Sequence, residues 1–108
     1  MQERSSRGFV LIAIDGILSG FTAVDSGKSF VAGGDCEIME IVVSPKFQRQ
    51  SIARQLVQSS LDILKDRGCK RVGIEIGLYN RKSKSLFGNF GFEFYGRNGI
   101  WDEYYKEL

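Results

Sequence analysis

Two groups of residues in this 108-residue chain have the types and spacing that chemistry needs: a polar bend before a helix, and glutamates on neighbouring strands. The bend, 46–50, follows Pro45, which cannot donate to a strand ladder. The helix begins near Ser51, and the N–H groups of its first turn have no intrahelical partner. Ser51 and Ala53 are small enough to let a pyrophosphate approach, and Arg49 adds positive charge. The bend indicates an anion site; an ordinary strand-to-helix connection is the alternative, because the glycines and lysine of a P-loop are absent.

Glu40 is the candidate for the group that accepts a proton. It interrupts an apolar strand, where a charged side chain is costly unless it has a partner or a function. The alternative is a solvent-facing or salt-bridged glutamate. Glu37 and Glu75 are weaker candidates, and Glu75 shares the face of Glu40 or pairs with a lysine. The chain has no histidine, which excludes histidine triads, histidine-ligated zinc and a histidine base.

The elements that must position these groups alternate in a simple order. We expect strands at 8–14, 17–24 and 36–43, a helix from 51 to about 67, a strand at 71–79, a helix at 81–89 and strands at 92–95 and 100–106. Asp15-Gly16 and Asn98-Gly99 are hairpin turns, because both positions of such pairs take positive φ readily. A strand, a helix and a strand imply a right-handed crossover and parallel pairing. The order β-β-β-α-β-α-β-β therefore predicts an α/β fold: one three-layer α/β/α domain, 1–108, with a mixed, mostly antiparallel sheet.

Composition narrows the class of protein. With 43% hydrophobic and 26% charged residues, the chain is typical of a soluble globular domain. The net charge of +2 is too small to indicate nucleic-acid binding, and no apolar run approaches the ~20 residues of a membrane span. The polar start lacks the apolar core of a secretory signal, so we expect a cytoplasmic protein with neither a nucleic-acid nor a membrane partner. Cys36 and Cys69 lack metal-site spacing and are expected to be free thiols, with no metal bound.

Two motifs resemble those of the GNAT superfamily of N-acyltransferases. The segment Val43 to Ala53 reads V-x-P-x-F-Q-x-x-S-I-A and resembles the coenzyme A motif V-x-P-x-[YF]-[RQ]-x-x-G-[IV]-[GA]. The segment Asn80 to Phe92 resembles the second signature, N-x-x-A-x-x-L-Y-x-x-x-G-F, with Ser83 at the alanine and Phe87 at the tyrosine. The two motifs occur in the family's order, and with their strands they cover roughly Cys36 to Tyr105.

This resemblance implies a GNAT-like fold and a reaction. Acetyl-CoA would be the acyl donor and an amine of a small molecule or protein the acceptor, with direct attack in a ternary complex. Pantetheine would pair with backbone of the strand before the bend, where that strand diverges from its parallel neighbour, and the first helical turn would hold the pyrophosphate. The implied cofactor-binding residues are Ile41, Val42, Val43, Gln48, Arg49, Gln50, Ser51, Ile52, Ala53, Arg54, Asn80, Ser83 and Phe87, and Glu40 is the catalytic residue.

Some of these positions have a structural alternative. Asn80 is equally suited to be the N-cap of a helix. Arg81, Lys82 and Lys84 reach the adenosine phosphates or form a solvated helix face. At the tyrosine position Phe87 has no proton to give, and nothing in the spacing of the four tyrosines identifies a substitute. A catalytically weak or inactive CoA-binding sensor or assembly module is therefore the alternative function, and a small protein-interaction domain that binds no CoA is the third.

The start of the chain also departs from the family. Members usually have a strand and one or two helices before the first hairpin, where they help to wall the acceptor pocket. Only about seven residues precede Gly8 here. The acceptor site is therefore either incomplete in one chain or completed by a second subunit, and we expect a homodimer that also covers an exposed sheet edge.

Overall fold

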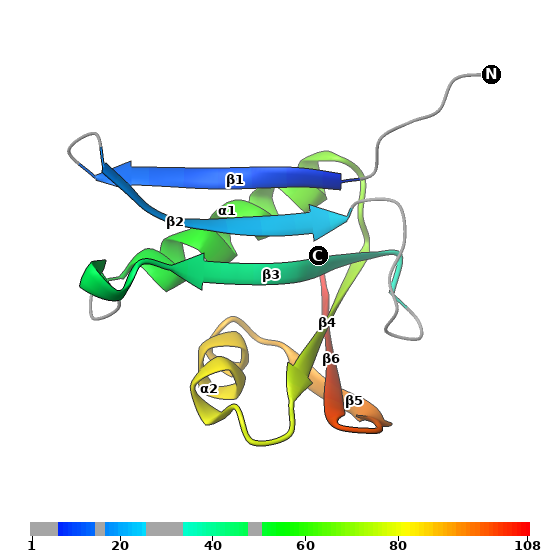
Figure 1. The fold of residues 1–108 in the computed structure, drawn as a ribbon. Coiled ribbons are helices and arrows are strands. Elements are labelled where there is room, and N and C mark those ends of the chain that lie inside the picture. Colours follow the sequence, from blue (N-terminus) through cyan, green and yellow to red (C-terminus); the bar gives the residue numbers. More distant parts are fainter. Residues whose placement is uncertain (1–6, 15–16, 26–33, 48–50) are drawn as a thin grey trace.

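The computed structural model describes residues 7–14, 17–25, 34–47 and 51–108 (Figure 1). The strands are β1 (Arg7–Ile14), β2 (Ile17–Asp25), β3 (Cys36–Val43), β4 (Arg71–Gly77), β5 (Glu93–Asn98) and β6 (Trp101–Glu107). The helices are α1 (Ile52–Asp66) and α2 (Arg81–Asn89), and a short 3-10 turn, η1 (Pro45–Phe47), follows β3. The predicted element order is confirmed. The turn at Asp15-Gly16 lies outside the described residues, although the strands on either side of it pair as expected.

The described strands form one mixed sheet in the order β1-β2-β3-β4-β6-β5. Neighbours are antiparallel except for β3 and β4, which are joined through α1 and run parallel. The predicted α/β class and mostly antiparallel sheet are confirmed.

The described residues form two of the three layers that the sequence predicts. Both crossovers, β3-α1-β4 and β4-α2-β5, proceed in the same direction along the sheet, so right-handed connections place both helices on one face. Buried residues of both helices, Val57 and Phe87 among them, share one core cluster with Ile38 and Ile74 of the sheet. No described helix covers the opposite face, which we call the open face.

Helix α1 buries the face that its sequence period predicts. Its buried residues are Ile52, Leu56, Val57, Ser60, Leu61 and Leu64, which recur at helical spacing. The helix ends before Gly68, whose φ of 89° is the left-handed conformation that glycine adopts without strain. Among the described residues, no helix is long and apolar enough to cross a membrane.

Ion pairs to the buried carboxylate of Asp102 hold α2 against the sheet. Lys84 of α2 donates to the carboxylate of Asp102 and to the carbonyl of Leu78, at 2.7 Å in each case. Arg97 of β5 donates to the other side of Asp102, whose side chain is only 3% exposed. Lys84 is therefore a structural cation, which corrects the expectation that it reaches a phosphate or lies in solvent.

A β-bulge in β3 decides which way its side chains point. Ala23 of β2 is opposite Glu40 and Val24 is opposite Ile38, so Met39 is the extra residue of the bulge. The extra residue resets the alternation of the strand. Ile38 and Ile41 consequently both lie on the core side, three positions apart.

Strands β3 and β4 pair over only two positions, Cys36 with Val72 and Glu37 with Gly73, and then separate. Beyond the bulge the two strands no longer form a ladder, and side chains of both line a common cavity. The predicted divergence of these parallel strands is confirmed.

Gly20 lets β2 and α1 approach closely. A Cβ atom at this position would lie 2.6 Å from the carbonyl oxygen of Val42 and 3.1 Å from Leu56 Cδ1. The first of these is a backbone atom, which cannot rotate away. A glycine inside a strand often marks a bulge or a close approach, and Gly20 does both, because it also lies beside a register shift between β1 and β2.

Replacing Gly20 with alanine should therefore destabilise the fold. We expect Gly20→Ala to lower the free energy of unfolding by about 1–3 kcal/mol, as overpacking typically does. Gly88→Ala is the matched control: no described atom lies within 4 Å of the methyl group that alanine would add, and alanine in a helix is more stable than glycine by about 0.5–1 kcal/mol. Urea unfolding measures both, and equal effects of the two substitutions would contradict the packing argument.

Candidate functional site

The first cavity lies beside the end of β3, between the first turn of α1 and the helix α2. It has a volume of about 340 Å³ and is lined by Ile41, Val43, Ala53, Asn80, Lys82, Ser83, Leu86 and Phe87. Six of these eight residues belong to the cofactor-binding set expected from the sequence. Three segments far apart in the chain thus meet where the resemblance placed one binding site.

The other residues of that set have different positions. Val42 points away from this cavity and is 38% exposed, while Ile52 is fully buried in the core. Arg54 is exposed on α1. Ser51 occupies the N-cap position of α1, but its side chain makes no cap bond and accepts a hydrogen bond from Gln55 instead. Gln48, Arg49 and Gln50 lie outside the described residues.

The second cavity, of about 140 Å³, is the gap between β3 and β4. Met39, Glu40 and Ile41 line it from one strand, and 74–77 line it from the other. Asn80, Ser83 and Phe87 line both cavities, which makes the two neighbours. Trp101 of β6 completes the wall. The gap thus connects the α2 side of the sheet with carboxylates on the open face.

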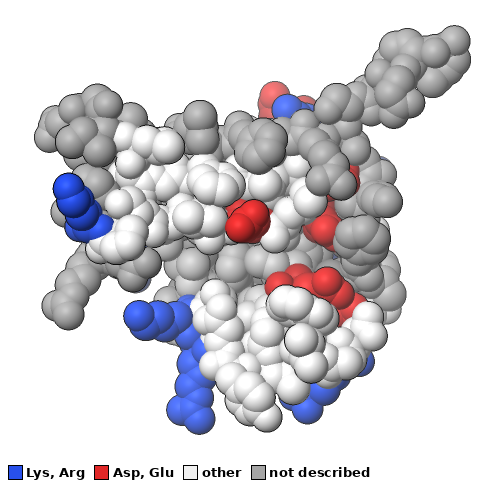
Figure 2. Space-filling view, in the orientation of Figure 1, with Lys and Arg blue, Asp and Glu red and all other residues white. Residues whose placement is uncertain are grey.

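Glu40 lies in this gap but is exposed, not buried as its apolar neighbours suggested. The reason is the bulge at Met39, which turns Glu40 to the open face while its carbonyl oxygen accepts a hydrogen bond from Thr22 on the helix side. Figure 2 shows the open face: acidic side chains gather near the middle of the view, and basic side chains lie toward its margins. The solvent-facing alternative for Glu40 is therefore correct, although the residue still lines the gap.

Glu75 is the glutamate whose chemistry the structure alters. It is half-buried in β4, directly opposite Glu103 of β6. Burial raises its pKa above the ordinary value, and the negative charges of Glu103 and Glu37 and a hydrogen bond to Glu103 raise it further. A carboxyl group with a raised pKa is a better proton acceptor from an amine than an ordinary surface glutamate.

The residue at the family's tyrosine position, Phe87, has no proton to give, and no described tyrosine takes its place in the cavities. Phe87 is 3% exposed, and its ring packs edge-on against Phe92 with 5.2 Å between centroids. Tyr79 is 92% exposed and points away from the fold, and Tyr105 donates to Glu93 at the sheet edge. None of the four tyrosines lines either cavity.

Asn80 is a helix N-cap, the alternative role considered for it, and it also lines the candidate site. It is the N-cap of α2, and its side-chain oxygen accepts a hydrogen bond from the backbone N–H of Ser83 at 3.1 Å. Both residues line both cavities. The cap therefore holds the start of α2 against the gap.

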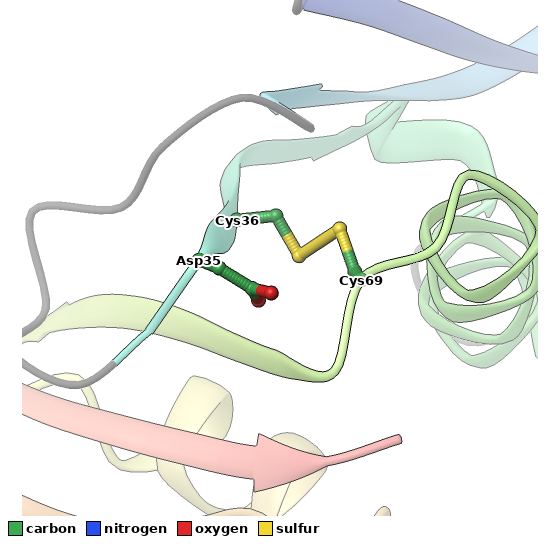
Figure 3. Close-up of side chains that lie close together, drawn as sticks. All are labelled: Asp35, Cys36 and Cys69. Carbon is green, nitrogen blue, oxygen red and sulfur yellow. A yellow bond between two sulfur atoms is a disulfide. The ribbon is translucent and has the colours of Figure 1, made fainter.

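A cluster of Asp35, Cys36 and Cys69 lies at the closed end of the strand pair (Figure 3). The two cysteines form a disulfide, with 6.2 Å between their Cα atoms, so the expectation of free thiols is wrong. Sequence spacing could not reveal this pairing, because the fold brings together residues 33 positions apart. The Asp35 carboxylate accepts hydrogen bonds from the N–H groups of Lys70 and Arg71. These atoms are already engaged, so we assign no metal to the cluster.

Two residues of the gap were missed by sequence reasoning. Gly77 and Trp101 are paired across β4 and β6, and among the described residues the Trp101 ring is the only neighbour within 4 Å of a Cβ built on Gly77. A signal for the glycine existed, because a glycine inside a strand often marks a close approach. Nothing in the sequence identified Trp101, since its position depends on the register of β6.

With this geometry in place, comparison with known proteins is informative. The acetyltransferase (GNAT) family profile matches residues 1–92. The chain belongs to this family. It is 24% identical over 99 residues to the protein named "Putative ribosomal protein bS18-alanine N-acetyltransferase" of Bacillus subtilis, covering 92% of this chain and 60% of that protein. It is 30% identical over 96 residues to streptothricin acetyltransferase of Streptomyces lavendulae, covering 88% and 49%. The chain thus spans about half the length of these relatives.

Solved structures agree with the fold. The crystal structure of PH1933 from Pyrococcus horikoshii OT3 matches with a TM-score of 0.80 at 30% identity, over 89% of this chain and 62% of that chain. PaiA N-acetyltransferase from Thermoplasma acidophilum, in complex with coenzyme A, matches with a TM-score of 0.81 over 95% and 62%. At 18% identity the second match shows the fold alone.

The network beneath the site predicts an acid-dependent loss of stability. Hydrogen bonds from Arg97 and Lys84 lower the pKa of Asp102 to about 2 from an ordinary 3.8. A carboxylate with a lowered pKa stabilises the fold above its unfolded pKa and ceases to do so as pH falls through its folded pKa. Its contribution should thus be lost between about pH 4 and pH 2.

Asp102→Asn should lower the free energy of unfolding at pH 7 and flatten its pH dependence over that window. Asp66→Asn, an exposed charge removal at the end of α1, is the control and should leave the pH dependence intact. Urea unfolding at a series of pH values measures both variants. An Asp102→Asn protein that keeps the wild-type pH dependence would contradict the assignment.

Proposed function

We propose that this chain is an N-acetyltransferase that binds acetyl-CoA in the first cavity, with the acetyl end toward the gap between β3 and β4, and transfers the acetyl group to an amine. One observation carries the proposal: the β3–β4 separation opens two neighbouring cavities, one lined by the expected cofactor residues and the other by carboxylates. Structures of similar fold were solved with coenzyme A or acetyl-CoA, which supports this donor class.

The first cavity suits the pantetheine arm. Ile41, Val43 and Ala53 are apolar, and beyond Glu37 the two strands no longer pair with each other, so an amide-bearing arm could take the place of a neighbouring strand. The start of α1 faces the same cavity through Ala53, and the amides of a helix start favour phosphate. Lys82 adds positive charge to the lining.

The chemical step is direct transfer. The amine nitrogen attacks the thioester carbonyl carbon, the new C–N bond forms and the C–S bond breaks. The amine loses a proton to a carboxylate, for which the structure offers Glu75 and Glu40 on the two sides of the gap. The leaving thiolate takes its proton from water, since Phe87 has none to give. A thiolate is stable near neutral pH, so this end of the reaction needs less help than the amine end.

The amine acceptor, small molecule or protein, is not fixed by these contacts. The relatives named above include a ribosomal-protein alanine N-acetyltransferase and a streptothricin acetyltransferase, and so cover both kinds of acceptor. A cytoplasmic location and a homodimer are further parts of the proposal. The dimer is supported by the open face, on which no described helix lies and where Val42 and Trp101 are partly exposed; light scattering tests it.

The alternative is a CoA-binding module without catalysis, favoured by the buried and protonless Phe87. Such a module would bind CoA in the same site but would not need a carboxylate that accepts a proton from an amine. The cofactor site and the carboxylates therefore need separate tests.

Binding is tested by filling the first cavity. Ala53→Leu should weaken acetyl-CoA binding by tenfold or more, because the larger side chain occupies the space between β3 and α2. Gln58→Leu, exposed on the same helix and outside both cavity linings, is the control. Isothermal titration measures affinity, and at ~100 times the dissociation constant the ligand should stabilise the wild type by about 2.7 kcal/mol. A wild type that binds no acetyl-CoA, or an Ala53→Leu protein that binds it equally, would sink the cofactor proposal.

Catalysis is tested at the carboxylates. Glu75→Gln should lower kcat by about 10²–10⁴-fold, the usual range for a general base, while acetyl-CoA affinity changes little. Since the pKa of Glu75 is raised, the acidic limb of the wild-type kcat/KM profile should lie above pH 4.5 and disappear in the variant. Glu40→Gln, measured in parallel, shows whether Glu40 is the catalytic residue that the sequence indicated. A module that only binds CoA would show no turnover in any of the three proteins.

A further inference from the structure

Two buried hydroxyl groups lie beneath the β3 bulge, and neither belongs to the lining of the two cavities. Thr22 of β2 and Ser60 of α1 are both 0% exposed, and their side-chain oxygens are 3.0 Å apart. The other residues on the buried face of α1 are apolar. Valine and alanine have nearly the shapes of threonine and serine and would bury no hydroxyl group, so apolar packing does not account for this pair.

The two hydroxyl groups connect α1 to the backbone of β3 through β2. Thr22 Oγ1 donates a hydrogen bond to the carbonyl oxygen of Glu40 at 2.9 Å. Ser60 Oγ has one proton and two acceptors within reach, Thr22 Oγ1 at 3.0 Å and the carbonyl oxygen of Leu56 at 2.7 Å. When Thr22 accepts the proton of Ser60, its own proton is directed to Glu40. The serine therefore favours the orientation in which the threonine donates to β3.

The Glu40 carbonyl belongs to the peptide unit that also carries the N–H of Ile41. In a trans peptide the C=O and N–H bonds point in opposite directions, so a carbonyl held on the β2 side turns this N–H toward β4. The ladder between β2 and β3 agrees. The N–H of Ser44 donates to the carbonyl of Ser19, and three positions along the ladder Ile41 and Thr22 form a pair without backbone hydrogen bonds to each other.

The N–H of Ile41 lies at the junction of the two cavities. Strands β3 and β4 pair only at Cys36 and Glu37, so the ladder between them does not engage this N–H. Ile41 lines both cavities, whereas Val43 lines the first and Glu40 the second. A donor that lies in the first cavity and presents its acetyl group to the carboxylates passes Ile41 at its thioester. The thioester oxygen becomes negative as the amine attacks, and a fixed N–H aimed at that oxygen lowers the barrier.

We infer that Thr22, held by Ser60, is a positioning residue for acetyl transfer, because its hydroxyl group aims the Ile41 N–H at the thioester carbonyl of the bound donor. This inference rests on the proposed function and assigns a role to two side chains that touch neither donor nor acceptor. The hydroxyl group acts in two ways. Its hydrogen bond fixes the tilt of a peptide beside a bulge, where the regular ladder is disrupted. It also polarises that peptide, which makes the N–H a stronger donor.

The first test detects the hydrogen bond without turnover. Acetyl-CoA that is isotope-labelled at the thioester carbonyl is saturated with wild-type, Thr22→Val or Thr22→Ser protein, and its infrared carbonyl band is compared with that of free acetyl-CoA. A hydrogen bond lowers the frequency of a carbonyl stretch. We expect this downward shift in the wild type, its loss in Thr22→Val, which lacks only the hydroxyl group, and its return in Thr22→Ser. No shift in the wild type, or an equal shift in Thr22→Val, would overturn the inference.

The second test measures how far the bound thioester is activated. Hydroxylamine is mostly uncharged at neutral pH, so it attacks without a protein base or an acceptor pocket. The C–N bond forms, the C–S bond breaks and the nitrogen proton reaches the thiolate through water, which gives acetohydroxamate and coenzyme A. Thr22→Val should slow this reaction about tenfold to hundredfold, less than the ~10²–10³-fold loss of a deleted oxyanion donor, because the N–H is misdirected but still present. Ser60→Ala should slow it less, and neither variant should change acetyl-CoA affinity.

Val57→Ala is the control for a general loss of stability. Val57 is fully buried on the same face of α1, so its truncation loosens the packing without removing a hydroxyl group. It should lower the Tm at least as much as Thr22→Val does, yet leave the infrared band and the hydroxylamine rate unchanged. Equal rate losses in the two variants would make Thr22 merely structural and contradict its assigned role.

The two tests also separate this inference from the proposed function. An infrared shift that depends on Thr22, in a protein that transfers no acetyl group to amines, would refute the acetyltransferase while keeping the positioned N–H. Acetyl transfer to amines by a protein whose infrared band does not respond to Thr22→Val would refute the role of Thr22 while keeping the acetyltransferase.

Discussion

The structure depends on a parallel strand pair that is held at one end only. Strands β3 and β4 share two paired positions and then separate at the Met39 bulge. The closed end is fastened by several contacts: the Cys36–Cys69 disulfide, the Asp35 carboxylate on the N–H groups of 70 and 71, and a backbone bond from Asp35 to the carbonyl of Arg71. Because this end is fixed, the other end opens without unfolding the sheet. The gap between the strands follows from that opening, and the Met39 bulge places Glu40 at its open-face side.

Local sequence signals were sufficient for the elements and for much of the cofactor cavity. The α1 face follows from apolar residues at helical spacing, and the bounds of α2 follow from Asn80 as cap and from Gly91 just after its end. Asn98-Gly99 predicted the last hairpin, where Gly99 has a φ of 64°. The motif resemblance then placed Ile41, Ala53 and Asn80 in one site, because it encodes spatial relations that periodicity alone does not.

The features that sequence reasoning missed depend on contacts between distant residues. One extra residue at Met39 changed the side to which Glu40 points, and a bulge has no strong local signature. The pairing of Cys36 with Cys69 and the ion pair of Lys84 with Asp102 each require the register of the whole sheet. A lysine on a short polar helix is expected to be solvated. Only the position of β6 against α2 shows that Lys84 meets Asp102 instead. The choice between Glu40 and Glu75 has the same origin, since it depends on how deeply each strand is covered.

The fold provides more groups for deprotonating the amine than for protonating the leaving thiolate of the proposed reaction. No tyrosine among the described residues lines either cavity, whereas Glu40 and Glu75 line the gap on the amine side. An alkyl ammonium group has a pKa near 10, so obtaining a free amine is the harder task at neutral pH. Carboxylates alone would oppose it, because they stabilise the charged form of a nearby ammonium group. The raised pKa of Glu75 reduces this conflict, because a carboxyl group that binds a proton more tightly can take one from the amine instead of only stabilising its charge.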